Sequence, residues 1–251
     1  MSEPAGRPEG IPARHFESLA ERELSYFWHR SRVNWVETVL RRSYPDPGRL
    51  NVVDFGCGTG GLLHLVRKRI GFRRFLGVDA SAQAIALARR LGPDYAVVDP
   101  ETYAPETDTD LVLLMDVIEH VADDVGLLAR LLAPLETGAA LLISVPAAPM
   151  LYTDWDRALG HHRRYTRASL SKAVRRAGAE VAFLSYGFSY LLPIGLVRRA
   201  SRPAYEGECV FPPVPRWADR SLLLLNRIEL AACRALPIPF GTSLFCLARR
   251  T

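Results

Sequence analysis

The sequence predicts one α/β domain built on a doubly wound, mostly parallel sheet of seven strands. Short and almost continuously apolar runs alternate with helical segments along the chain, as they do in parallel sheets that are covered on both faces. A cluster of glycines follows the first of these runs, where a strand would turn into a helix. The chain has 251 residues, of which 49% are apolar, so it can bury a sizeable core and is not disordered as a whole.

The order of the elements follows from hydrophobic periodicity and turn residues. A helical region over 13–44 comes first, and the prolines and glycine of 45–48 end it. Seven runs are typical of strands: 50–55, 75–78, 95–98, 111–115, 140–145, 181–186 and 243–248. We expect one further helix to follow the glycines and end near Ile70, and the next to be capped by Ser81. Three more are expected over about 125–132, 168–177 and 217–234. These elements suggest an N-terminal helical cap (1–48) and a core (49–251) with substrate-side insertions at about 146–168 and 187–240.

Composition excludes several classes of protein. Residues 1–12 contain no hydrophobic run, so we expect no secretory signal. The four cysteines form no CxxC pair, which suits a reduced, cytoplasmic protein better than a disulfide framework or a zinc site. The net charge is +5, and all but two of the 32 basic residues are arginine. This arginine bias is weak evidence for nucleic acid, and we expect no nucleic-acid partner.

The glycine-rich turn contains Gly56, Gly58 and Gly60 between the first strand and the following helix. Glycine at such positions lets the backbone pass close to a ligand. The same turn also fits the dinucleotide-binding pattern, which is a weak signal by itself. Asp54 decides between a dinucleotide and a ligand without phosphate. A carboxylate there would repel a pyrophosphate but can hold an ammonium group.

Further carboxylates end the next two strands. Asp79 follows the second strand and can accept hydrogen bonds from both hydroxyls of a ribose, and Asp99 follows the third strand and could meet the edge of an adenine. An alternative for Asp99 is an ordinary turn residue before Pro100. A ligand with a ribose, an adenine and an ammonium group but no phosphate describes S-adenosylmethionine. The expected cofactor-binding set is Asp54, Gly56, Cys57, Gly58, Gly60, Asp79, Ala80, Asp99, Met115 and Asp116.

Over roughly residues 49–146 the sequence resembles the class I S-adenosylmethionine-dependent methyltransferases. The glycine signature of that family falls on residues 54–60, its ribose-binding acid falls on Asp79, and the segment 113–121 also looks similar. The resemblance implies a Rossmann-like class I methyltransferase fold, S-adenosyl-L-methionine as cofactor and S-adenosyl-L-homocysteine as product.

The segment after the fifth strand is dense in aromatic and ionisable residues. Histidine can remove a proton from a hydroxyl near neutral pH, and arginine pairs with carboxylates or phosphates. Our hypothesis is that His161 is a general base, and that Arg163, Arg164 and Tyr165 position an acidic or polar substrate. A structural hydrogen bond from His161 to Asp156 or Asp154 is the alternative. The expected catalytic residues are His161, Asp156 and Tyr165.

A subset of these methyltransferases, found among saccharide, lipid and natural-product genes, is similar here as well. In that subset a tryptophan and aspartate precede a Gly-His-x-Arg-Arg-Tyr element, which matches Trp155, Asp156 and residues 160–165. Its N-terminal helix carries an aromatic and arginine cluster, which matches residues 26–32 except at His29 and Ser31. We therefore expect the acceptor to contact Tyr26, Trp28, Arg30, Tyr152, Arg163 and Arg164.

Two segments admit a second interpretation. Asp116, Glu119 and His120 are similar in spacing to the Glu-x-x-Glu-His element of methyltransferases that use a divalent ion, but the shorter Asp116 favours a loop junction and no metal. Residues 181–197 carry no charge and precede Arg198 and Arg199. Their serines, glycines and proline argue against a transmembrane helix, and leave a core strand and helix, a substrate tunnel or a peripheral membrane contact.

The sequence therefore predicts methyl transfer from S-adenosylmethionine to a small molecule, foremost to an oxygen of a natural product, saccharide or lipid-linked intermediate. Nitrogen or carbon acceptors are alternatives on the same fold. Two alternatives belong to other classes: an NAD(P)-dependent oxidoreductase, and a binder of S-adenosylmethionine without catalysis. The oligomeric state and the identity of the acceptor do not follow from the sequence.

Overall fold

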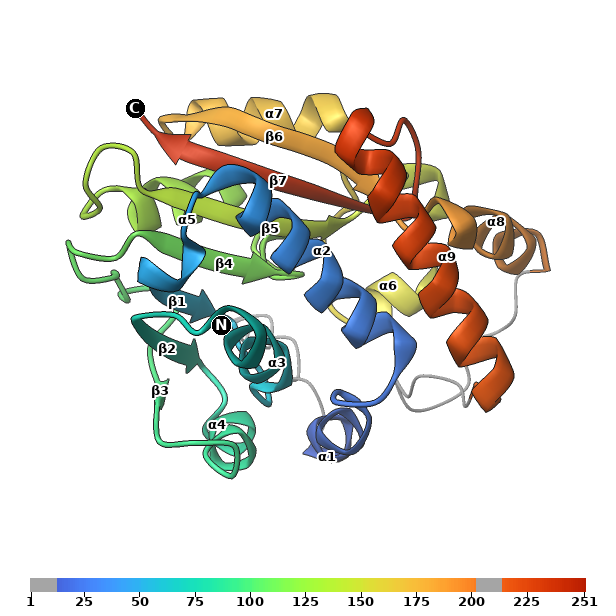
Figure 1. Cartoon of the computed structure of the whole chain (residues 1–251), viewed down its shortest axis with the longest axis horizontal. Helices are drawn as coiled ribbons and strands as arrows, with labels where there is room; N and C mark the ends of the chain where they lie inside the picture. Colours follow the sequence, from blue (N-terminus) through green and yellow to red (C-terminus); the bar gives the residue numbers. More distant parts are fainter. Residues whose placement is uncertain (1–12, 202–213) are drawn as a thin grey trace, which may run out of the picture.

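The computed structural model describes residues 13–201 and 214–251, and contains one sheet of seven strands in the order β3-β2-β1-β4-β5-β7-β6 (Figure 1). The strands are β1 (Asn51–Phe55), β2 (Arg74–Asp79), β3 (Tyr95–Val97), β4 (Leu111–Met115), β5 (Ala140–Pro146), β6 (Ala179–Gly187) and β7 (Ser243–Arg250). The first five are parallel, and β7 is antiparallel to both β5 and β6. The predicted doubly wound, mostly parallel sheet is confirmed, and each predicted strand lies within two residues of an observed one.

The strand order reverses between β1 and β4, which pair directly in parallel. Chain connections on the two sides of such a point leave in opposite directions, so a crevice opens beyond the carboxyl ends of these two strands. This crevice positions the site described below.

The helices are α1 (Ala13–Arg22), α2 (Phe27–Ser43), α3 (Gly61–Ile70), α4 (Ala82–Ala88), α5 (Asp124–Leu132), α6 (Asp154–Ala158), α7 (Arg167–Arg176), α8 (Leu192–Ser201) and α9 (Arg216–Ala235). The single helical region expected over 13–44 is two helices, because the chain breaks between Arg22 and Phe27. The break lets α1 pack on α4 while α2 packs on α3 and α9. Residues 1–12 of the predicted cap and 202–213 of the second predicted insertion lie outside the described residues.

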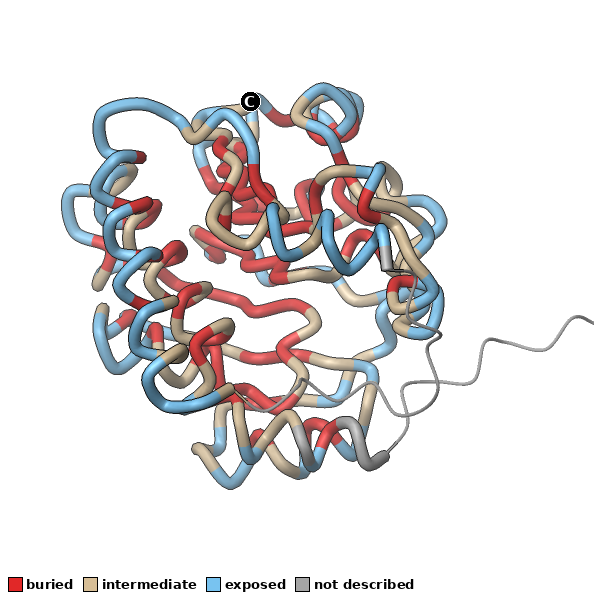
Figure 2. Tube along the Cα trace, turned by 90° about the vertical axis from the view of Figure 1, so that its right-hand side faces the viewer, coloured by how far each residue is buried: buried red, intermediate tan, exposed pale blue. Residues whose placement is uncertain are grey.

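The core has two layers, one on each face of the sheet, and buried residues concentrate on the strands (Figure 2). Along β4 the side chains alternate, so that Leu111, Leu113 and Met115 face α2 and α3, while Val112 and Leu114 face α5 and α7. On α2, Trp35 is fully buried and stacks on Phe245 of β7 at 4.6 Å between ring centroids. Packing of α2 on this face fixes which of its side chains reach the crevice.

No helix among the described residues is long and apolar enough to cross a membrane.

The first predicted insertion, about 146–168, contains α6, and the second, about 187–240, contains α8 and α9.

Candidate functional site

A cavity of about 1480 Å³ lies beyond the carboxyl ends of β1, β2 and β4. Residues of α1 and α2 line one side of it, and residues of α6 and α8 line the other. Pockets for a single small ligand are commonly about 300–1,000 Å³. The cavity therefore has room for a cofactor and an acceptor side by side. We call the part beside β1, β2 and β4 the cofactor half, and the part beside α6 and α8 the acceptor half.

The glycine loop forms the floor of the cofactor half, next to β1. Gly56, Gly58 and Gly60 have φ of +76°, +54° and +80°, a region that favours glycine. The amides of Gly56 and Cys57 donate to the carbonyl of Val78 on β2, at 2.8 and 3.0 Å. A Cβ on Gly56 would lie 2.7 Å from a methyl group of Val117. The loop is therefore fixed close to the sheet and leaves its upper surface open to a ligand.

Asp79 ends β2 and lines the cavity beside this loop. One carboxylate oxygen accepts a hydrogen bond from the amide of Gly58 at 2.9 Å, and the other accepts one from the amide of Ser81 at 2.8 Å. Each oxygen keeps a further lone pair for a ligand hydroxyl. The two amides thus fix the carboxylate of Asp79 at the cavity, with lone pairs of both oxygens left for a ligand.

Asp54 is a buried carboxylate whose Oδ1 has no hydrogen-bond donor among the described residues. Burial, together with the nearby acids Glu23 and Asp79, raises its pKa to about 7, and Arg32 lowers it in part. A buried carboxylate without a donor is costly unless a ligand supplies one. Because Asp54 lines the cavity, a bound ammonium group would satisfy it.

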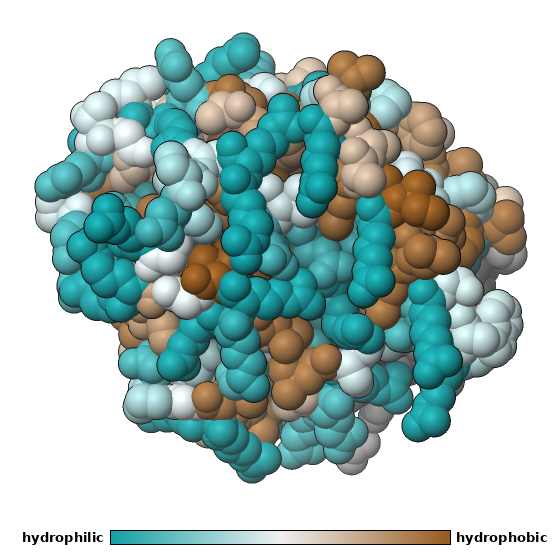
Figure 3. Space-filling model, in the orientation of Figure 1, coloured by the Kyte–Doolittle hydropathy of each residue, from teal (hydrophilic) through white to brown (hydrophobic). Residues whose placement is uncertain are grey.

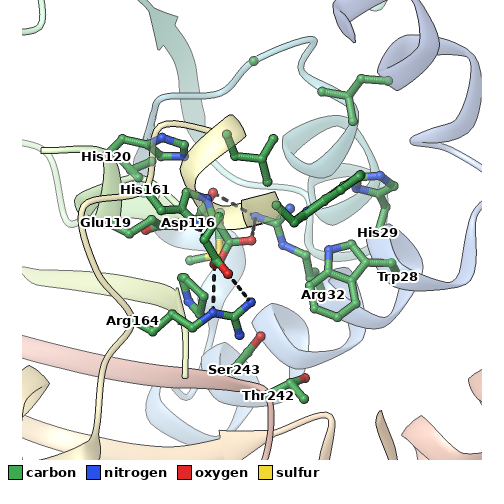
Figure 4. Close-up of a pocket in the computed structure, with 18 of the residues that line it drawn as sticks. Trp28, His29, Arg32, Asp116, Glu119, His120, His161, Arg164, Thr242 and Ser243 are labelled. Carbon is green, nitrogen blue, oxygen red and sulfur yellow. Dashed lines mark hydrogen bonds and ion pairs between the residues drawn. The ribbon is translucent and has the colours of Figure 1, made fainter. Parts of the chain in front are cut away.

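Arg32 on α2 crosses the cavity to the end of β4 (Figure 4). It donates to the carbonyl of Met115 at 2.8 Å and pairs with Asp116 at 3.1 Å, and its buried Nε has no acceptor among the described residues. Asp116 has a φ of +60°, which is uncommon for a residue with a side chain, and it accepts a hydrogen bond from Ser144. Arg32 therefore places one positive group between the carboxylates of the cofactor half.

The acceptor half centres on Asp156 of α6, whose carboxylate is fully buried. Arg164 donates to both of its oxygens, at 2.8 and 3.0 Å, and Nδ1 of His161 lies 2.9 Å from Oδ1. The amide of Thr153 donates to it as well. Burial would raise the pKa of Asp156, but the hydrogen bonds from His161 and Arg164 outweigh burial and lower it to about 2.

The imidazole of His161 also lies beside His120 and Glu119 (Figure 4). One potential ligand atom from each of the three lies within 4.8 Å of the others. Burial and the neighbouring His161 lower the pKa of His120 to about 4, and burial holds the pKa of Glu119 well above its ordinary range. In this environment the neutral forms of both groups are favoured. The sequence-based expectation that no metal binds here stays a prediction.

The structure brings most of the predicted residues to one cavity. The predicted residues that line it are Tyr26, Trp28, Asp54, Gly56, Cys57, Gly58, Asp79, Ala80, Met115, Asp116, Tyr152, Asp156, His161 and Arg164. His161 and Asp156 form the hydrogen bond that the sequence offered as the alternative to a base, and the two roles are compatible. Gly60 does not line the cavity and is the N-cap residue of α3, which begins at Gly61.

Besides Gly60, four predicted residues lie outside the cavity lining and make other contacts. Arg30 faces Asp219 of α9 at 3.9 Å, and Arg163 pairs with Asp124 at 3.3 Å. The hydroxyl of Tyr165 donates to Asp124 at 2.7 Å in the core. Asp99 is exposed, and its carboxylate accepts from the amide of Glu101, which is the turn interpretation. Each of these four side chains makes a structural contact, so the arrangement gives no support to the predicted ligand contacts of Arg30, Arg163, Tyr165 and Asp99.

Two charged residues of the site were missed from the sequence. Arg32 was noted only as part of the N-terminal cluster. Glu23 is buried at the start of α3, where it accepts a hydrogen bond from Thr59 and from the amides of Gly61 and Leu62, and burial raises its pKa. Its carboxylate caps the N-terminus of α3. The N-cap residue Gly60 cannot do this, because glycine has no side chain. The sequence could have indicated the position of Glu23 only through the break between α1 and α2. The hydrophobic periodicity does not reveal that break.

Comparison with known proteins identifies the family. The family model described as methyltransferase domain matches residues 27–182. The chain belongs to this family. Curated relatives include trans-aconitate 2-methyltransferases: that of Acidovorax sp. (strain JS42) is 33% identical over 113 residues, which cover 44% of this chain and 43% of the relative. The enzyme of Mycobacterium sp. (strain KMS) is 32% identical over 126 residues, which cover 50% of this chain and 48% of the relative. The matches thus span about half or less of these relatives.

Solved structures share the fold of this methyltransferase at low identity. A chain of the Haloferax volcanii complex that contains the Trm112 methyltransferase activator has a TM-score of 0.61 and 20% identity, covering 94% of this chain and 93% of that one. An S-adenosylmethionine-dependent methyltransferase from Mesorhizobium loti has a TM-score of 0.56 and 21% identity, covering 87% and 98%. The [4+2]-cyclase SpnF has a TM-score of 0.59 and 16% identity, covering 96% and 99%.

S-adenosylmethionine, the cofactor of the class I methyltransferase fold, fits the groups in the cofactor half. The buried Asp54 that lacks a donor suits the ammonium group, and the unpaired Nε of Arg32 suits the carboxylate. The amide-held Asp79 suits the ribose, and Val98 and Pro100 are apolar residues of the lining that would suit the adenine.

Proposed function

We propose that this methyltransferase transfers the methyl group of S-adenosylmethionine to a hydroxyl oxygen of a small molecule that has both an acidic or polar part and an apolar part. The observation that supports this most directly is the pair of His161 and ionised Asp156 at 2.9 Å in the acceptor half of the cavity. A carboxylate on Nδ1 keeps the proton of the imidazole on that nitrogen. Nε2 is then the proton acceptor.

His161 acts as a general base in this proposal. When bound, S-adenosylmethionine supplies a methyl group on a sulfonium leaving group and is released as S-adenosylhomocysteine. Nε2 of His161 accepts the proton of the acceptor hydroxyl as that oxygen bonds to the methyl carbon, and Asp156 stabilises the imidazolium that results. Arg164 holds Asp156 in place, so its role is positioning rather than substrate contact. Residues 160–165 would then be the acceptor-side signature of this subset of the family.

The lining of the acceptor half indicates the class of acceptor. Leu191, Ile194 and Leu196 form an apolar wall, and Arg198 and Arg199 follow them at the cavity. Such a wall suits a natural product, a saccharide with an apolar group, or a lipid-linked intermediate, and the arginines suit an acidic group on it. The curated relatives are named for trans-aconitate, an acid without a hydroxyl, so a trial with it tests the acidic part of the acceptor and not the proposed base.

The first test is calorimetric titration with S-adenosylhomocysteine, with NADH and NADPH as controls. Micromolar binding of S-adenosylhomocysteine alone is expected. Tight binding of NADH or NADPH without it would contradict the assignment of the glycine loop. Acceptors are then screened by mass spectrometry for a gain of one methyl group, and location of the label on nitrogen or carbon would overturn the preference for oxygen.

The second test separates catalysis by His161 from bracing of the loop. His161→Ala should lower kcat about a hundredfold, which is a typical contribution of a general base, and leave the affinity for S-adenosylhomocysteine unchanged. The matched control is His162→Ala, since His162 is adjacent and exposed. Unchanged turnover in His161→Ala would refute the base, and a parallel loss in His162→Ala would indicate disruption of the loop instead.

A further inference from the structure

Helix α9 presents three strips of different chemistry along its length. Leu223, Leu230 and Cys233 are buried, and the last two belong to the core layer that α2 also lines. On the outer side, Trp217, Leu224, Leu225 and Ile228 are 73%, 57%, 42% and 57% exposed. At 100° per residue, positions 217, 224 and 228 fall within 40° of one another, so they form one apolar stripe along the helix.

Four exposed arginines follow one flank of this stripe: Arg216, Arg220, Arg227 and Arg234. The last three are seven residues apart, and a repeat of seven drifts only about 20° per heptad around an α-helix. Both acids of α9 are engaged elsewhere, since Asp219 accepts from the amide of Phe27, and Glu229 is buried and accepts from the amides of Phe188 and Ser189. The exposed surface of α9 therefore carries positive charge only.

A second cavity, of about 650 Å³, lies in the groove between α2 and α9 on the arginine side. Arg227 and Arg234 line it together with Arg41 and Arg42 of α2. The one acid in its lining, Glu37, pairs with both Arg41 and Arg69. Basic side chains thus surround a hollow of a size that admits a phosphate group, directly beside the apolar stripe. Figure 3 shows hydrophobic side chains bordered by long hydrophilic ones on the right, where α9 runs.

We propose that this face of α9 docks on an anionic membrane surface. The apolar stripe lies at the level of the acyl chains, while the arginine row and the groove bind the phosphates of the headgroups. A second copy of this chain fits the same face poorly, because pairing two such faces would bring arginine rows together without acids to compensate them. An exposed apolar strip with a one-signed basic flank is the pattern of a helix that lies in a membrane interface.

Helix α9 also borders the active-site cavity, but not with the docking face. Leu222 of α9 lines that cavity and lies about 140° around the helix from Trp217 of the stripe. Membrane docking thus goes beyond the proposed reaction and does not depend on it, because the vesicle assay below needs neither cofactor nor acceptor.

Flotation with vesicles tests the proposal on the full chain. We expect binding to phosphatidylcholine vesicles that contain about one third phosphatidylglycerol, and little binding to phosphatidylcholine alone. The triple variant Arg220→Gln, Arg227→Gln and Arg234→Gln should weaken binding roughly a hundredfold, because each arginine near an anionic surface contributes about fivefold. The matched control removes three exposed charges from α7, as Lys172→Gln, Arg175→Gln and Arg176→Gln, and should bind like the unaltered chain.

A second variant tests the apolar stripe. Leu224→Gln with Ile228→Gln replaces only exposed side chains, and should abolish the vesicle binding that persists at high salt. Three outcomes would overturn the proposal: no binding to anionic vesicles, equal loss in the α7 control, or a stripe variant that changes only self-association. Binding of inorganic phosphate in the groove with no preference for vesicles would also overturn it. Titration of each variant with S-adenosylhomocysteine shows separately whether the methyltransferase site is intact.

Discussion

Two aspartates in the cavity, Asp54 and Asp156, are buried to the same degree but have opposite electrostatics. Asp54 has no donor at Oδ1, and its pKa is raised by burial to about 7. Asp156 accepts hydrogen bonds from His161, Arg164 and Thr153, which overcome the effect of burial and lower its pKa to about 2. Burial is common to both, so the number of donors makes the difference. Asp54 has Arg32 near it but accepts no hydrogen bond at Oδ1 among the described residues, so it can bind a cation of a ligand. Asp156 already accepts hydrogen bonds from Arg164 and His161 and holds these side chains in place.

This contrast distinguishes the two halves of the cavity. The cofactor half consists of backbone amides and strand-end carboxylates whose remaining lone pairs await a ligand. In the acceptor half Asp156, Arg164 and Nδ1 of His161 satisfy one another, which leaves the other ring nitrogen of His161 and the apolar wall for the proposed reaction. Substitutions in one half should therefore leave the other half functional, and four predictions test this.

The largest effect is expected for Asp156→Ala. Removal of this carboxylate leaves Arg164 buried without its counter-ion, which costs about 3–5 kcal/mol in the free energy of unfolding. Methyl transfer should be lost while S-adenosylhomocysteine still binds at low temperature. Chemical denaturation and calorimetry measure the two quantities. The control Asp154→Ala removes an exposed ion pair with Arg157 and should change stability by less than about 0.5 kcal/mol. A large loss of cofactor affinity in Asp156→Ala would show that the halves are coupled.

The next largest effect is expected for Asp54→Asn. Loss of the charge should weaken binding of S-adenosylhomocysteine by about 2 kcal/mol, or roughly thirtyfold. Because the pKa of Asp54 is raised to about 7 without ligand, protonation competes with the ammonium group below pH 7. The affinity of the unaltered chain should then fall by up to about tenfold per pH unit below 7 and level off above it. Titrations between pH 5.5 and 8.5 check this, and an affinity that does not vary with pH would contradict it.

The raised pKa of Asp54 also has a consequence for stability. In the unfolded chain this carboxyl ionises at its ordinary value of 3.8, and in the folded chain only near pH 7. Ionisation therefore favours the unfolded state, and this penalty grows as pH rises from 3.8 to about 7. The Asp54→Asn variant should be more heat-stable than the unaltered chain at pH 8 without ligand, although it binds the ligand less tightly.

A smaller effect is expected for Arg32→Gln, with Arg30→Gln as its matched control. Arg32 pairs with Asp116 and leaves Nε free for the cofactor carboxylate, so its loss should weaken S-adenosylhomocysteine about tenfold. Arg30 faces Asp219 at 3.9 Å and is 39% exposed, so its loss should change affinity less than twofold. Equal effects of the two substitutions would show that net charge, rather than the position of Arg32, matters.

The pair of arginines also shows how far the sequence could lead. Asp54, Asp79 and the glycine loop were predictable, because their roles depend on a few consecutive residues at the end of a strand. Arg30 and Arg32 differ by 200° around α2, and the choice between them depends on how that helix packs on the sheet. The break between α1 and α2, which moves Glu23 to the start of α3, depends on the same packing. Long-range contacts of this kind leave no local pattern.

In the acceptor half the sequence identified a segment that borders the cavity, but not which of its side chains face it. His161, Arg163, Arg164 and Tyr165 are consecutive or nearly so, and ionisable groups in a loop suggested substrate contact for all of them. The loop between α6 and α7 turns His161 and Arg164 toward the cavity and Tyr165 into the core. Which side chains turn inward is set by the bridge between Ala147 and Tyr165, a contact across residues that the sequence pattern does not link.

The smallest effect is expected for Tyr165→Phe, and it tests this last distinction. The ring stays in the core, and the hydrogen bonds from its hydroxyl to Asp124 and to the carbonyl of Ile118 are lost, which costs about 1 kcal/mol of stability. Burial and Asp124 hold the pKa of Tyr165 above its ordinary value, so the hydroxyl stays protonated and donates within the core. We expect turnover within twofold of the unaltered chain below the unfolding temperature. A loss of turnover comparable to that of His161→Ala would instead restore Tyr165 to the catalytic group.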